Sequence, residues 1–163
     1  METTPASNLA YLQLVLLVVV LIPAIFFLLT QQNTLKAIRP ENRLMQPGLV
    51  WLQFIPFVGQ VWQFIVVTKI AGSIKQEMES SGEDSILGIA DAMSVDELRT
   101  KPTFNIGITY CSLNIIYILL NLLTRGRTST LLGLLALVGM IFWIIYWVQL
   151  AGWKKKLQRF AVV

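Results

Sequence analysis

Apolar residues gather along this chain in four long runs that short polar segments separate. The runs cover about residues 9–29, 49–71, 104–123 and 131–150. A helix needs about 20 apolar residues to cross the hydrocarbon core of a bilayer, and each run has about this length. The pattern therefore predicts an all-α membrane protein in which residues 1–163 form a single domain with four transmembrane helices.

The second run differs from the others because it contains glutamines, a lysine, Pro56 and Gly59. Proline removes a backbone donor inside a helix, so we expect a kink at this point. The alternative is a break into two half-helices with exposed backbone carbonyls, an arrangement typical of transporter binding sites. The helix is expected to leave the membrane after Ala71 and to stop near Gly82.

A polar connector covers residues 72–103, between the second and third runs. Its acidic residues alternate with apolar ones, and Ser94 and Glu97 have the spacing of a capping box. We expect one or two short amphipathic helices there. They are suited to lie on the membrane surface or to cover one end of the helical bundle.

Composition supports the membrane prediction and narrows the chemistry. Charged residues make up 13% of the chain, about half of the roughly 25% found in soluble domains. The chain has no histidine and a single cysteine, Cys111, which excludes an intramolecular disulfide, a Cys/His zinc site and a histidine-activated nucleophile. We therefore expect a non-enzymatic protein without a cofactor. Its net charge of +4 is expected to face anionic lipid, with the bilayer and not nucleic acid as the partner.

Polar side chains recur at helical spacing in two of the predicted spans. They are Gln53, Gln60 and Gln63 in the second span, and Tyr110, Asn114, Tyr117 and Asn121 in the third. Each set falls on one face of its helix. One interpretation is interhelical hydrogen bonding, worth about 0.6 kcal/mol per bond in membranes. The other is a polar groove or pore between the two spans, and a proton relay is not expected because none of these groups ionises at neutral pH.

Two arginines, Arg39 and Arg43, flank Glu41 in the loop before the second span. Guanidinium groups bind phosphate in a bidentate manner, so both residues are candidates for contact with lipid phosphates or a partner. The alternative is that they only set the topology and anchor the helix, as basic residues beside a membrane span often do.

Basic residues also indicate an orientation. Four spans would place both termini and the connector on one side, and this side carries more Lys and Arg than the other. The positive-inside rule then predicts cytoplasmic termini, supported by Lys154, Lys155 and Lys156 directly after the last span. The first span points the other way, because no basic residue precedes it and Lys36, among others, follows it.

The segment from Arg39 to Leu52, with sequence RPENRLMQPGLVWL, is followed by Ile55-Pro56, by Trp62-Gln63-Phe64 and by residues 70–75, IAGSIK. Together these stretches, within residues 39–75, resemble a group of uncharacterised bacterial multi-pass membrane proteins with four spans. The resemblance implies a protein of the bacterial inner membrane. It carries over no catalytic or binding residue.

Two functions remain open from the sequence. The first is a structural or interaction protein, such as an accessory or self-assembling subunit of a membrane complex, which would be a homo-oligomer or part of a larger assembly. The second is a small oligomeric transporter or channel that uses the polar face of the second and third spans. Solute flux through liposomes would favour the second, and a co-purifying protein partner would favour the first.

Overall fold

The computed structural model describes residues 5–84, 101–125 and 129–160, and within these ranges every regular element is a helix. The prediction of an all-α protein is confirmed for this part of the chain. The elements are α1 (Pro5–Lys36), the 3-10 helices η1 (Pro40–Asn42) and η2 (Pro47–Phe54), α2 (Val58–Asp84), α4 (Phe104–Leu123) and α5 (Thr130–Phe160).

Three of the described helices are long and apolar enough to cross a membrane. These stretches are Tyr11–Lys36, Phe104–Leu123 and Thr130–Gln158. Helix α1 has 32 residues and is therefore about 48 Å long at about 1.5 Å per residue, more than the roughly 30 Å of a hydrocarbon core. The arrangement is compatible with a membrane protein.

The second predicted span, 49–71, is not a single helix, and the expected kink is a complete break. Helix η2 ends at Phe54, a turn follows over residues 55–57, and α2 begins at Val58. Pro56 has no N–H for a helical ladder, and Phe57 has a φ of 62°, so the chain reverses here. We call residues 47–71 the hairpin, with its tip at 55–57. The eight residues of η2 rise only about 16 Å, too little to cross a membrane.

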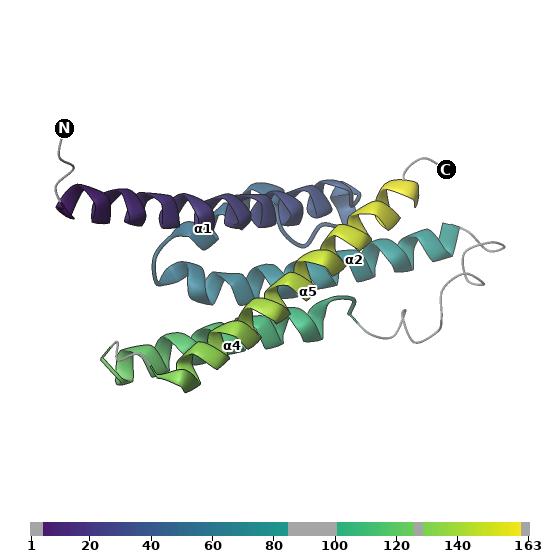
Figure 1. Ribbon diagram of the computed structural model, residues 1–163. Helices are drawn as coiled ribbons and strands as arrows, with labels where there is room; N and C mark the ends of the chain where they lie inside the picture. The colour runs from purple at the N-terminus through teal and green to yellow at the C-terminus, as the bar shows by residue number, and fades with distance from the viewer. Residues whose placement is uncertain (1–4, 85–100, 126–128, 161–163) are drawn as a thin grey trace.

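The path of the chain places both ends of the hairpin at the same end of the bundle. Figure 1 shows α1 running to Lys36, η2 returning beside it, and α2 running back again; α4 and α5 then run out and back. The start of α1 and the end of α5 consequently lie at opposite ends of the bundle (Figure 1). The expected placement of both termini on one side assumed four crossings, whereas three of the described helices are long and apolar enough to cross a membrane.

The predicted connector, 72–103, is only partly described. Its first portion belongs to α2, which continues past the expected stop at Gly82 to Asp84. The capping box at Ser94 and Glu97 and the predicted amphipathic helices lie outside the described residues.

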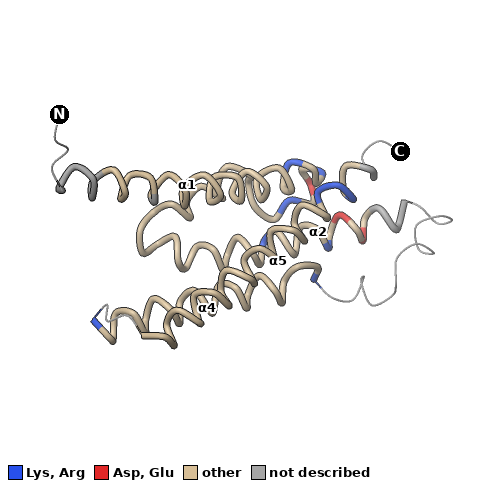
Figure 2. The backbone as a smooth tube through the Cα atoms, viewed as in Figure 1, with Lys and Arg blue, Asp and Glu red and all other residues tan. Residues whose placement is uncertain are grey.

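Charge divides the bundle into two ends. Figure 2 shows Lys and Arg gathered where α1, α2 and α5 end, which we call the charged end, whereas Arg125 is the one charged residue described at the opposite, apolar end. The tightly buried side chains lie mainly between the hairpin tip and the charged end, among them Leu35, Ile38, Val50, Val66, Ile70, Ile74 and Leu150. Toward the apolar end the apolar side chains are exposed, as a lipid-facing surface would be.

Candidate functional site

A cavity of about 770 Å³ lies at the tip of the hairpin. Its walls come from four parts of the chain: 19–28 of α1, 53–63 around the hairpin tip, 110–117 of α4 and 135–143 of α5. On the charged side of its tip, the hairpin packs against α1 and α4. Because it turns back there, the space beyond it between α1, α4 and α5 is left open.

The structure brings most of the polar residues singled out in the sequence to this cavity. The residues that line it are Gln53, Gln60, Gln63, Tyr110, Asn114 and Tyr117. Asn121 is not among the lining residues, since it lies two turns beyond Asn114 toward the apolar end of α4. The helical spacing that grouped these side chains in the sequence therefore corresponds to a shared location.

Hydrogen bonds do not join the two sets of polar residues. The Gln53 amide donates to Oε1 of Gln31 at 2.6 Å and to the carbonyl of Val50 at 3.0 Å. The Gln63 amide donates to Oε1 of Gln60, one turn earlier on the same helix, at 2.8 Å. Within the described residues, the interhelical amide bond at the cavity therefore links the hairpin to α1, not to α4.

Several uncharged polar groups of the cavity remain without a protein partner. In the described part of the chain, no side-chain hydrogen bond involves Tyr110, Asn114 or Tyr117. Pro23 also lines the cavity, and because it lacks an N–H, the carbonyl of Val19 loses its usual helical donor. None of the described lining residues is charged. The cavity thus offers neutral donors and acceptors in apolar surroundings, where leaving them unpaired costs free energy.

The residues that line the cavity differ widely in exposure. Val20 and Met140 are 69% and 55% exposed, whereas Gln63 and Phe27 are 6% and 4% exposed. The exposed side chains of Val20 and Met140 mark an apolar mouth between α1 and α5. The floor of the cavity lies against the hairpin and carries the glutamines.

Aromatic side chains close the floor where α5 crosses α1. The ring of Phe27 makes edge contacts with Trp143, Tyr146 and Trp147 at centroid distances of 5.5, 5.9 and 6.1 Å. Nε1 of Trp147 donates to Oγ1 of Thr30 at 2.9 Å. Aromatic pairs of this geometry favour a defined arrangement, so the crossing holds α5 against α1.

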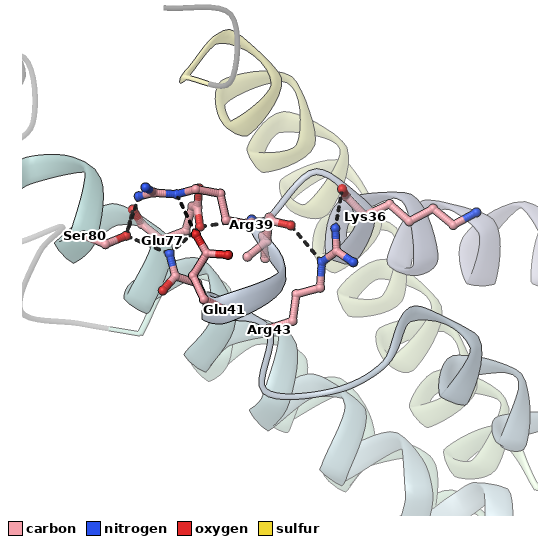
Figure 3. A network of polar contacts seen from close by, with 8 residues as sticks. Lys36, Arg39, Glu41, Arg43, Glu77 and Ser80 are labelled. Carbon is pink, nitrogen blue, oxygen red and sulfur yellow. Dashed lines mark hydrogen bonds and ion pairs between the residues drawn. The ribbon is translucent and has the colours of Figure 1, made fainter. Parts of the chain in front are cut away.

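The loop after α1 is held against α2 by a buried carboxylate, that of Glu77 (Figure 3). Its side chain is only 8% exposed. It accepts from Nε of Arg39 at 3.0 Å, from the backbone N–H of Arg39 at 3.2 Å and from the amide of Asn42 at 2.6 Å. Charge-assisted bonds of this kind are stronger than neutral ones, so they fix the loop after α1 on the side of α2.

Neighbouring residues extend this contact. Oγ of Ser80 accepts from both Arg39 and Asn42 at 2.7 Å, and the backbone N–H of Leu44 donates to Oγ of Ser73 at 2.8 Å. A Cβ on Gly72 would lie 2.6 Å from Cδ1 of Leu44, so the small residue permits close packing. The loop 39–44 and the turns of α2 from 72 to 80 thus form one unit, which we call the clasp.

The second loop arginine has a different structural role. The guanidinium of Arg43 donates to the carbonyl of Lys36, the last residue of α1, at 3.1 Å. It also donates to the carbonyl of Ile38, just after the helix, at 2.8 Å. Helix carbonyls at this position lack intrahelical donors, and a basic side chain satisfies them. Both predicted lipid-contact residues, Arg39 and Arg43, therefore make contacts within the protein.

Sequence reasoning overlooked Gln31 and Glu77, which are 1% and 6% exposed. Glu77 falls within the polar connector predicted over residues 72–103, yet it follows Ile70, Ser73 and Ile74 at helical spacing. That continuing stripe was the available signal that this face of α2 remains buried.

Comparisons with known proteins give no information on the function of this chain. A scan against protein-family models, a search of curated proteins and a search of solved structures find nothing that matches this chain.

Proposed function

We propose that this chain is a non-enzymatic integral membrane protein that binds an uncharged, largely apolar molecule in the cavity at the hairpin tip. In this proposal α1, α4 and α5 cross the bilayer, and the hairpin enters and leaves it on the same side. The observation that carries the proposal is the set of unpaired neutral polar groups, among them Asn114 and Tyr117, in a cavity without charge.

The size and closure of the cavity favour a binding site over a pore. A volume of about 770 Å³ falls within the range of roughly 300–1,000 Å³ that small-molecule sites occupy. Between the cavity and the charged end, Val50, Val66 and Val67 are at most 1% exposed. This packed layer separates the cavity from the charged end.

We further propose that the charged end is cytoplasmic. The described Lys and Arg residues other than Arg125 lie toward that end, as the positive-inside rule requires (Figure 2). This orientation also agrees with the first span, which is followed by Lys36, Arg39 and Arg43. The end of α5 is then cytoplasmic and the start of α1 is on the far side. The resemblance of residues 39–75 favours the bacterial inner membrane.

An accessory or self-assembling subunit is the second candidate function. The observation that favours it is Gly133 on the exposed surface of α5, where an added Cβ would meet no atom within 4 Å. Small residues let two membrane helices approach closely, so this face is suited to a second copy or another membrane protein.

The test compares two asparagines of α4 that differ in whether they line the cavity. Wild-type protein, Asn114→Leu and the matched control Asn121→Leu are purified from native membranes in mild detergent, and bound small molecules are extracted and identified by mass spectrometry. We expect a molecule bound to wild type and to Asn121→Leu. Asn114→Leu should retain about tenfold less, the effect of about 1.4 kcal/mol.

Equal recovery from all three proteins, or none from wild type, would contradict the binding proposal. A protein partner that co-purifies equally with the three forms, without a small molecule, would support the accessory-subunit function instead. Thermal unfolding of each variant checks that a loss of ligand does not reflect a loss of folding.

A further inference from the structure

Resting on the proposed function, we infer that the ligand is a membrane-soluble molecule with an apolar chain and one compact uncharged hydroxyl or carbonyl group. It enters the cavity sideways, between α1 and α5, from the half of the bilayer that faces away from the charged end. The polar group lies on the floor near the hairpin tip, and the chain leaves through the mouth.

The floor of the cavity favours an uncharged polar group, because the described residues that line it carry no charge. Gln60, Gln63 and Asn114 present amides, and Tyr110 presents a phenol, so both donors and acceptors are available. A hydroxyl or carbonyl group can pair with them. A phosphate, carboxylate or ammonium would meet no opposite charge among the described lining residues, and an unpaired ion in apolar surroundings is strongly disfavoured.

The mouth of the cavity favours an apolar chain, because the exposed side chains that border it are apolar. Val20 and Met140 line it and are more than half exposed, and the neighbouring Ala136 is also exposed. These side chains offer no hydrogen-bonding group to a water-soluble solute. A chain that passes between them continues directly into the region where lipid acyl chains would surround the exposed apolar end.

The helices leave a lateral route to this mouth. α5 crosses α1 at the contact of Phe27 with Trp143, and Figure 1 shows α1 lying apart from the α4 and α5 pair toward the apolar end. Small residues of α5 border the route, and a Cβ on Gly139 would meet no atom within 4 Å. Because residues of both α1 and α5 line the cavity, access between these two helices would come from the side of the bundle.

The experiment uses protein in lipid nanodiscs and two photoreactive probes with the same alkyl chain and diazirine position, one a long-chain alcohol and the other a quaternary ammonium. After illumination, the labelled peptides are located by mass spectrometry. We expect the alcohol to label 19–24 and 135–140 at least about fivefold more than the ammonium, as a discrimination of about 1 kcal/mol or more would give. Excess unlabelled alcohol should abolish this labelling but not that of other exposed surfaces.

Two glycines of α5 provide matched variants for the route. Gly139→Leu fills the mouth and should remove most of the competable labelling, whereas Gly133→Leu lies outside the cavity and should leave it unchanged. The comparison of the two probes on wild type does not depend on how either variant folds.

Equal labelling by the two probes, or labelling at the mouth that excess alcohol does not reduce, would overturn the inferred ligand class. Unchanged labelling in a folded Gly139→Leu would overturn the lateral route. The proposed function would survive these results if native membranes yielded a bound molecule of another class, sensitive to Asn114→Leu. It would fail together with the inference if they yielded none.

Discussion

Gly59 lies against the carbonyl oxygen of Gln53, so close that a Cβ on Gly59 would overlap it. This contact joins the start of α2 to the end of η2 and closes the hairpin just behind its tip. Gln53 in turn donates to Gln31 at 2.6 Å, which ties the closed hairpin to α1. The hairpin, which forms the floor of the cavity, can therefore close in this way because Gly59 has no side chain.

We predict that Gly59→Ala destabilises the protein by about 1–3 kcal/mol, because the added methyl group must displace backbone and not a flexible side chain. The measurement is the midpoint of thermal unfolding in detergent. Gly133→Ala is the control, since its Cβ would meet no atom within 4 Å and alanine favours a helix by about 0.5–1 kcal/mol. The two substitutions should thus have opposite signs, and equal effects would contradict the closed hairpin.

Glu77→Gln should lower stability by about 1–3 kcal/mol, because it removes the charge from a buried carboxylate that accepts from Arg39 and Asn42. Glu79→Gln on the same helix is the control. Its carboxylate lies 3.5 Å from Lys75 and is 54% exposed, so the effect should stay below about 0.5 kcal/mol. Denaturant titration measures both values, and similar losses would show that the clasp contributes nothing specific.

The coupling within the clasp can be measured separately. The double variant Arg39→Gln with Glu77→Gln should lose clearly less stability than the sum of the single losses, since the two side chains contact each other at 3.0 Å. Additive losses in the double-mutant cycle would contradict a direct interaction.

Cysteine accessibility tests the path of the chain. We predict that Glu41→Cys and Lys155→Cys, both at exposed positions, are labelled by an impermeant maleimide from the same side of the membrane. Four crossing helices would instead place them on opposite sides. Wild-type protein is the control, because Cys111 is fully buried and should not react. Labelling of both cysteine variants only after the membrane has been permeabilised would support a cytoplasmic charged end.

Purified protein in liposomes should not conduct ions, because Val66 and Val67 belong to a packed layer between the cavity and the charged end. Fluorescence assays of ion flux at several protein densities provide the measurement. A flux that grows with the amount of protein and disappears in Gln60→Leu would favour the oligomeric channel function over a closed binding site.

Much of the architecture could be predicted from local patterns. Runs of apolar residues predicted α1, α4 and α5. The length and apolar character of a helix decide whether it can cross a bilayer, and both can be read from its own residues. Helical periodicity also grouped Tyr110, Asn114 and Tyr117 on one face of α4. These properties depend only on neighbours along one helix, so the sequence contains them.

The pairing of distant groups depended on the tertiary structure. Whether Pro56 and Gly59 kink a helix or reverse the chain depends on the contact between Gly59 and Gln53, and on whether α1 is placed to accept η2. Likewise, a carboxylate such as Glu77 is buried only because the loop after α1 brings Arg39 to it.

The orientation in the membrane likewise depends on both the sequence and the tertiary structure. Basic residues along the chain gave conflicting indications, because their assignment to sides required the number of crossings. The hairpin bears on that number, because residues 47–71 begin and end toward the same end of the bundle. The sequence alone determined which segments avoid water and which side chains remain polar within them. Only the packed structure decided that the polar groups border an open cavity, because a cavity is the space that helices from distant parts of the chain leave between them.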